Sequence, residues 1–216
     1  MFKKDTPACL SETVSTFEIL MQLGLEKAPV SIRTRDFLLS RQLEDGGWDE
    51  NPELLQFDPP PWDKPGEIRT RTWLSAEILR QLARNMGKGD PRLEKANNYL
   101  QENFDGQRIV GYKIASAIAL GAISLTSRWE GKKYEALLGT VREYSASETD
   151  PAFLAWLIDC YADAGFDHTD ESVRDCLNKL ESSQEPDGAW RSEDGDHWTV
   201  NTTINALRCL KWGRRW

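Results

Sequence analysis

Two acidic residues stand four positions apart in residues 151–164, a segment that is otherwise almost wholly apolar. If the segment is helical, Asp159 and Asp163 share one face, because residues four apart are neighbours on a helix. A carboxylate that faces another carboxylate holds its proton more tightly, which suits a general acid. The pair could equally mark the solvent-facing end of the helix. On this basis Asp159 is a candidate catalytic acid.

A second acidic group precedes the last segment with helical periodicity. Asp194, Asp196 and His197 stand just before residues 199–212. The simplest interpretation is a solvated turn and a helix cap, because acidic side chains are favoured at helix N-termini. The alternative is acid catalysis, so these three residues join Asp159 as catalytic candidates.

The residues that could bind a metal form no spaced motif. The sequence contains four widely separated cysteines: Cys9, Cys160, Cys176 and Cys209. Without a C-x-x-C pair, we expect reduced thiols packed in the core. A zinc site could be assembled from Cys160, His168 and His197, but no spacing among them demands one. The sequence therefore predicts no resident metal and no cofactor.

Composition limits the classes of partner. The chain has 216 residues, a formal net charge of −8 and a pI near 5.0. This length suits one domain over residues 1–216, and the acidic balance argues against nucleic-acid binding. The N-terminus has no apolar region of the signal-peptide kind, and no stretch is apolar enough to span a membrane. We expect a cytoplasmic protein.

Nine segments show helical periodicity, and none shows the alternation of a strand. The first is residues 7–23, and three helix starts follow from a capping residue before a proline at Thr6-Pro7, Asp90-Pro91 and Asp150-Pro151. Narrow apolar stripes mark residues 30–41, 92–103, 133–145 and 171–183. The alternate segments are more apolar: residues 71–86, 112–127, 151–164 and 199–212. This order predicts an all-α array of about four to five helical hairpins, with one-sided helices outside and buried helices inside.

A seven-residue pattern, Gln-x-x-x-Gly-x-Trp, occurs twice between a one-sided and a buried segment. The copies are Gln42-Leu-Glu-Asp-Gly-Gly-Trp48 and Gln184-Glu-Pro-Asp-Gly-Ala-Trp190. A third, incomplete copy begins at Gln101. Asp-Gly supplies a turn, the amide can bind backbone groups of a neighbouring helix, and the indole can cover that contact. The motif therefore indicates a repeat architecture, with its own residues in a structural role.

With these motifs between outer and inner helices, the chain resembles the squalene-hopene cyclase and prenyltransferase repeat superfamily, whose signature is called the QW motif. The resemblance implies an α/α toroid that is small or incomplete, because relatives use about six hairpins. It also implies an inner ring that encloses an apolar isoprenoid. Aromatic faces suit such a cavity because they stabilise passing cations. The candidate lining residues are Trp62, Trp73, Phe153, Trp156, Tyr161 and Trp198.

The chain departs from the catalytic motif of those relatives. Cyclases started by protonation carry Asp-x-Asp-Asp-Thr, whereas the nearest text here is Asp194-Gly-Asp-His-Trp-Thr199. Alignment on Thr202 instead places Asn201 at the position of the acid. The resemblance therefore supplies no motif for the reaction.

Three functions remain open from the sequence. The first is a small terpenoid-cyclase-like isomerase or lyase that uses acid-initiated cyclisation or isomerisation of an apolar substrate. The second is a non-catalytic module that binds a lipid or a protein, and the third is a prenyltransferase-like zinc enzyme. An incomplete toroid would expose helices of the buried type, so we expect a homodimer or a partner subunit that covers the open edge.

Overall fold

Nine α-helices make up most of the part of the chain that the computed structural model describes, residues 7–127 and 129–214. Their bounds are α1 Leu10–Gln22, α2 Pro29–Ser40, α3 Ile68–Met86, α4 Pro91–Glu102, α5 Lys113–Leu125, α6 Lys132–Ser147, α7 Pro151–Asp163, α8 Glu171–Ser182 and α9 Thr199–Arg214. These residues contain no strand, only an isolated bridge between Phe104 and Ile109. The all-α prediction is confirmed.

Two of the predicted helix starts are confirmed in atomic detail. The Asp90 carboxylate accepts the Arg92 N–H, and the Asp150 carboxylate accepts the Ala152 N–H at 2.7 Å. The third start was placed too early, because the first helix begins at Leu10 rather than at residue 7. Thr6, its predicted cap, lies outside the described residues.

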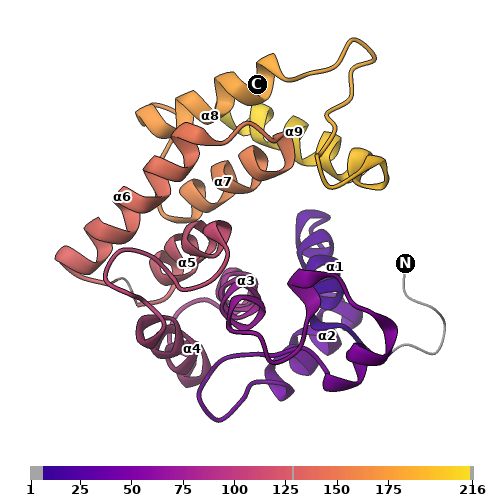
Figure 1. Ribbon diagram of the computed structural model, residues 1–216, viewed down its shortest axis with the longest axis vertical. Coiled ribbons are helices and arrows are strands. Elements are labelled where there is room, and N and C mark those ends of the chain that lie inside the picture. Colours follow the sequence, from indigo (N-terminus) through magenta and orange to yellow (C-terminus); the bar gives the residue numbers. More distant parts are fainter. Residues whose placement is uncertain (1–6, 128, 215–216) are drawn as a thin grey trace.

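The helices form two layers, as the alternation of apolar content predicted. Helices α3, α5, α7 and α9 pack in sequence along the inside of an arc, and α1 continues this row beside α3. Helices α4, α6 and α8 lie on the outside (Figure 1). Each outer helix packs chiefly against the inner helix that precedes it, which produces stacked hairpins.

The core is centred on α5 and on the inner helices beside it. Ten consecutive residues of α5, Ile114–Ile123, are buried, because α3, α6 and α7 all pack around this helix. A helix that is apolar nearly all round is stable only in such surroundings. The four cysteines are free and buried, as expected. No helix in the described part of the chain is both long enough and apolar enough to cross a membrane.

Both complete Gln-x-x-x-Gly-x-Trp motifs adopt one arrangement. The Trp48 indole N–H donates to the Leu38 carbonyl at 2.7 Å, ten residues earlier, and the backbone N–H of Trp48 donates to the Ser75 hydroxyl at 2.8 Å. Gly46 has a φ of 92°, and a Cβ there would clash with the backbone of Lys95. Only glycine fits such a turn.

The second copy repeats both hydrogen bonds of the motif tryptophan. The Trp190 indole donates to the Leu180 carbonyl at 2.6 Å, and the backbone N–H of Trp190 donates to the Thr203 hydroxyl at 3.1 Å. In the incomplete copy, Ile109 takes the place of the tryptophan and its N–H donates to the Ser116 hydroxyl at 3.1 Å. The motif thus connects an outer helix to the inner helix that follows it, in the structural role predicted.

The proline-rich segment between the first motif and α3 is partly helical. It contains two short 3-10 helices, η1 Pro52–Phe57 and η2 Pro61–Asp63. Leu54 anchors the segment in the interior, and η2 packs against α3. Trp62 remains 42% exposed.

Candidate functional site

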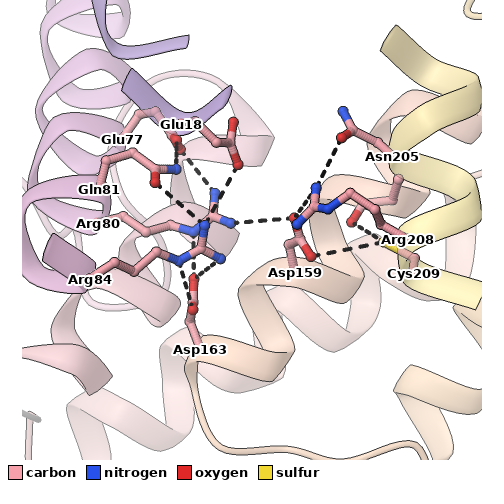
Figure 2. A network of polar contacts seen from close by, with 11 residues as sticks. Glu18, Glu77, Arg80, Gln81, Arg84, Asp159, Asp163, Asn205, Arg208 and Cys209 are labelled. Atoms are coloured by element: carbon pink, nitrogen blue, oxygen red, sulfur yellow. Dashed lines mark hydrogen bonds and ion pairs between the residues drawn. The ribbon is translucent and has the colours of Figure 1, made fainter. Parts of the chain in front are cut away.

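A network of charged side chains lies where α1, α3, α7 and α9 approach one another (Figure 2). We call it the central network. Its carboxylates are Glu18, Glu77, Asp159 and Asp163, and its guanidinium groups are Arg80, Arg84 and Arg208. It occupies the inner face of the arc, where the resemblance placed an apolar cavity.

Arg80 is the most buried member of the network, with a side chain that is 0% exposed. Its Nε donates to Asp163 Oδ2 at 2.7 Å and its Nη1 donates to Glu77 Oε2 at 3.1 Å. Burial lowers the pKa of Arg80, but the surrounding acidic groups, Glu77 and Asp163 among them, hold it well above its ordinary value. A charge this deep requires such partners, because an unpaired buried charge costs several kcal/mol. Its Nη2 has no hydrogen-bond partner among the described residues.

Asp163 is held by two arginines of α3. Arg84 Nε donates to Asp163 Oδ1 at 2.9 Å, and Arg84 Nη2 lies 2.7 Å from Oδ2, the oxygen that also accepts Arg80 Nε. Gly121 of α5 permits this approach, since a Cβ there would lie 3.2 Å from the Cβ of Asp163. A carboxylate engaged in this way is a structural anion rather than a proton donor.

Glu18 connects α1 to the network. Its carboxylate lies 3.6 Å from Arg84 Nη1. Burial raises the pKa of Glu18, and the nearby Glu77 and Asp159 carboxylates raise it further, whereas Arg80 and Arg84 oppose the shift. Glu18 therefore retains its proton to a higher pH than an ordinary glutamate does.

Two arginines related by the internal repeat converge on Asp159. The Trp48–Ser75 and Trp190–Thr203 hydrogen bonds align α3 with α9, and in this register Arg80 corresponds to Arg208. Arg80 Nη2 and Arg208 Nη1 lie 3.9 and 3.8 Å from the same oxygen, Asp159 Oδ2. The correspondence extends to the residue three positions earlier.

The residue three positions before each arginine binds that arginine in both helices. Glu77 accepts from Arg80 and Asn205 accepts from Arg208, each at 3.1 Å. An arginine and its partner three positions earlier are thus repeated on α3 and α9, and both arginines face Asp159 of α7.

Asp159 accepts no hydrogen bond from the arginines around it. Its side chain is 21% exposed, and among the described residues its one hydrogen bond is a long contact of 3.9 Å from the Cys209 thiol. The two guanidinium groups lie beyond hydrogen-bond distance. Asp159 can bind a cation or accept a proton, and the predicted pairing with Asp163 is replaced by pairing with arginines.

Three of the predicted aromatic lining residues form one group between α3 and α7. The rings of Trp73 and Trp156 meet edge to face with centroids 6.4 Å apart, and Phe153 stacks on Trp156 at 6.4 Å. All three are only partly buried. Trp156 precedes Asp159 by three positions on α7, so the aromatic group and the carboxylate share one helix face.

The other three aromatic candidates lie elsewhere. Tyr161 is 0% exposed and its hydroxyl bonds the Ser145 hydroxyl at 3.0 Å, so it fills the core between α7 and α6. Trp62 lies in η2, and Trp198 packs against His197 before α9. Among the described residues, no ring contact connects Trp62 or Trp198 with Trp73, Phe153 or Trp156.

Asp194, Asp196 and His197 occupy an exposed turn before α9. Asp196 and His197 belong to a 3-10 turn, η3 Asp196–Trp198, and the Asp194 N–H donates to the Ser192 hydroxyl. Asp150, at the start of α7, holds the turn: its carboxylate accepts the Glu193 N–H at 2.6 Å. This is the solvated turn that was the simpler interpretation, and it lacks the buried surroundings that an acid catalyst needs.

The candidate zinc ligands do not converge. Cys160 is buried in the core, whereas His197 is exposed. The only group in the described part of the chain with metal-ligand spacing is a different one, Cys9, Glu50 and Asp63. Among the described residues, Cys160, His168 and His197 therefore do not form the zinc site considered from the sequence.

Two surface hollows border none of these residues. A groove of about 590 Å³ between α6 and α8 is lined by polar side chains, Arg142, Asp170 and Asn178 among them, and a hollow of about 70 Å³ lies near Lys88. Neither is an enclosed apolar cavity.

Sequence reasoning missed the basic half of the central network. Arg80, Arg208 and Glu18 were not among the candidate residues. The signal that could have found them is the repeat itself: aligned on Ser75 and Thr203, both inner helices place an arginine at the same position. No protein-family model matches the chain, and no curated protein sequence matches it.

Proposed function

We propose that this chain is a helical-repeat binding module whose α8–α9 edge docks a further helical hairpin. The observation that carries the proposal is a row of exposed apolar residues on α9 at positions that α3 buries. Val200, Ile204 and Leu207 are 68%, 50% and 53% exposed. Residues three or four apart form one helix face, so these three make a continuous surface.

The internal repeat indicates what that surface accommodates. In the register of Ser75 and Thr203, the counterparts of Val200, Ile204 and Leu207 on α3 are Thr72, Ala76 and Leu79, all 0% exposed. Helix α3 buries these positions under the α4–α5 hairpin that follows it. Because the exposed face of α9 corresponds to the face that α3 buries, it favours another helical hairpin as its partner.

The motif glutamines support the same conclusion. Gln42 Nε2 donates both to the Gly46 carbonyl in its own turn and to the Arg92 carbonyl in the first turn of α4, each at 2.9 Å. Gln184 Nε2 makes only the equivalent bond to its own turn, to the Gly188 carbonyl at 3.0 Å, among the described residues. Its second amide hydrogen is free for the first turn of a docked helix.

The occupant that we propose is the α1–α2 edge of a second copy. This edge also exposes apolar side chains, Ile19 on α1, Leu23 just after α1 and Val30 at the start of α2. Placed beside α9, α1 would continue the inner row and α2 the outer row, so the carbonyl groups in the first turn of α2 would face Gln184. Such a contact joins two different surfaces, head to tail, and allows rings or chains of copies.

Substitution of Leu207 tests this proposal. Because a Leu side chain contributes about 1.5–3 kcal/mol when fully buried, Leu207→Glu should weaken self-association at least tenfold. Sedimentation velocity over a range of concentrations measures it. Val110→Glu is the matched control, since Val110 is 37% exposed and lies between α4 and α5, in the middle of the array and away from both edges. A wild-type chain that stays monomeric at every concentration, or equal effects of both variants, would refute the proposal.

A second function is favoured by the aromatic group between α3 and α7. Trp73, Phe153 and Trp156 offer apolar faces, and Asp159 offers a carboxylate one turn away. This arrangement suits an apolar ligand with a cationic or proton-donating centre, in line with the cyclase resemblance.

Incubation with a panel of linear and cyclic isoprenoids tests this alternative, with product analysis and tryptophan fluorescence as readouts. We expect quenching of Trp73 and Trp156, and loss of any turnover in Asp159→Asn. Asp194→Asn is the control and should behave as wild type. No binding and no turnover by the wild type would remove the alternative.

A further inference from the structure

A buried cluster of acidic and thiol groups lies where the N-terminus of α1 meets the segment after the first motif. Cys9 Sγ lies 3.2 Å from Glu50 Oε1 and 2.8 Å from the Ser11 hydroxyl. Asp63 completes the group: Cys9, Glu50 and Asp63 are 5%, 2% and 3% exposed, and their ligand atoms all lie within 4.8 Å of one another. The cluster is separate from the central network.

The two carboxylates of the cluster are not equally satisfied. Glu50 accepts the backbone N–H groups of Leu10 and Ser11, each at 2.8 Å, and so caps α1. Asp63 Oδ1 is buried without a hydrogen-bond partner among the described residues. No arginine or lysine in the described part of the chain forms an ion pair with Glu50 or Asp63. Buried carboxylates with neither partner nor counter-charge are costly, so this oxygen requires a binding partner of its own.

We propose that Cys9, Glu50 and Asp63 bind one divalent transition-metal ion, with Zn²⁺ as the best fit. Two ligands of a tetrahedral zinc ion, a thiolate at about 2.3 Å and a carboxylate oxygen at about 2.0 Å, lie roughly 3.5 Å apart. The Cys9 Sγ to Glu50 Oε1 distance of 3.2 Å is close to that spacing. The Ser11 hydroxyl or a water molecule takes the fourth position.

The donor set selects the class of ion. A thiolate favours zinc and other transition metals over Mg²⁺ and Ca²⁺, which prefer oxygen ligands alone. On binding, the Cys9 thiol releases its proton to solvent and the metal–sulfur bond replaces the S–H···O contact with Glu50. The buried position makes this a structural site, which fastens α1 to the segment that carries η1 and η2.

Cobalt provides a direct test, because Co²⁺ bound to a thiolate gives a charge-transfer band in the near ultraviolet. The purified chain is treated with chelator under reducing conditions, freed of it and titrated with Co²⁺ at neutral pH, and Zn²⁺ is then added. We expect one equivalent of Co²⁺ to bind and to give the band, Zn²⁺ to abolish it, and the melting temperature to rise with either ion.

Two variants assign the ligands. Cys9→Ser should lose the band, and Asp63→Asn should bind Co²⁺ at least tenfold more weakly. Cys176→Ser removes another buried thiol and Glu53→Gln removes an exposed acid of the same segment; both should bind as wild type. The proposal is overturned if the wild type gives no band and no thermal shift. It is equally overturned if the band persists in folded Cys9→Ser, or if the wild-type metal content is unchanged in Asp63→Asn.

Discussion

The two aspartates of the central network differ in how firmly their carboxylates are held. Asp163 is fixed by hydrogen bonds from Arg80 and Arg84, whereas Asp159 is 21% exposed and lies beyond hydrogen-bond distance of its arginines. The sequence placed Asp159 and Asp163 on one face correctly, because this follows from helical spacing alone. Their different environments depend on arginines of other helices, which no local pattern near residue 159 contains.

Glu18 makes the stability of the chain depend on pH. Its pKa lies above the ordinary value of 4.5, so the folded state binds the proton more tightly than the unfolded state. The stabilisation is fully present below the unfolded pKa and is lost as the pH rises through the folded pKa. The facing groups are Glu77, Asp159, Arg80 and Arg84.

Glu18→Gln removes this titration. Urea unfolding of both proteins from about pH 4 upward should show the wild type losing free energy of unfolding relative to the variant as the pH rises. Groups far from Glu18 titrate equally in both chains, so the difference reports Glu18 together with the charged groups that face it. Parallel curves for the two proteins would show that Glu18 titrates alike in the folded and unfolded states.

At the scale of helices and turns, the sequence predicted most of the fold. Nine helices, their alternation and the starts at Asp90 and Asp150 follow from periodicity and capping, which act within a few residues. The start of α1 was misplaced because its cap is Glu50, which lies 40 positions from Leu10 in the chain. The two 3-10 helices after the first motif are too short to show a helical period in the sequence.

The motif tryptophans act as structural side chains, and the two copies should cost the same when altered. Trp48→Phe and Trp190→Phe retain an aromatic ring but leave the carbonyl groups of Leu38 and Leu180 without their indole donor. Each carbonyl keeps another donor, the Arg41 N–H at 3.1 Å and the Ser183 hydroxyl at 2.8 Å, so the loss is that of one hydrogen bond, about 0.5–1.5 kcal/mol. Urea denaturation should show this loss for each variant. A loss at one site only would argue against equivalent roles for the two copies.

At the scale of the whole molecule, the repeat explains both the pair of arginines at Asp159 and the exposed apolar face of α9. The same register that brings Arg80 and Arg208 to Asp159 leaves Val200, Ile204 and Leu207 uncovered on α9. The sequence suggested an open edge from the number of hairpins, but it could not locate the exposed face, because exposure depends on which helices pack together. The contacts in the first copy indicate the geometry of the missing partner.

A mixing experiment tests the proposed head-to-tail contact most directly. Leu207→Glu disables the α9 edge and Leu23→Glu disables the α1 edge, so each variant alone should be monomeric in sedimentation velocity. Because each retains the edge that the other lacks, an equimolar mixture should form a heterodimer and nothing larger. Self-association of Leu23→Glu alone would show that the contact is not between these edges, and a mixture that remains monomeric would contradict the proposed contact.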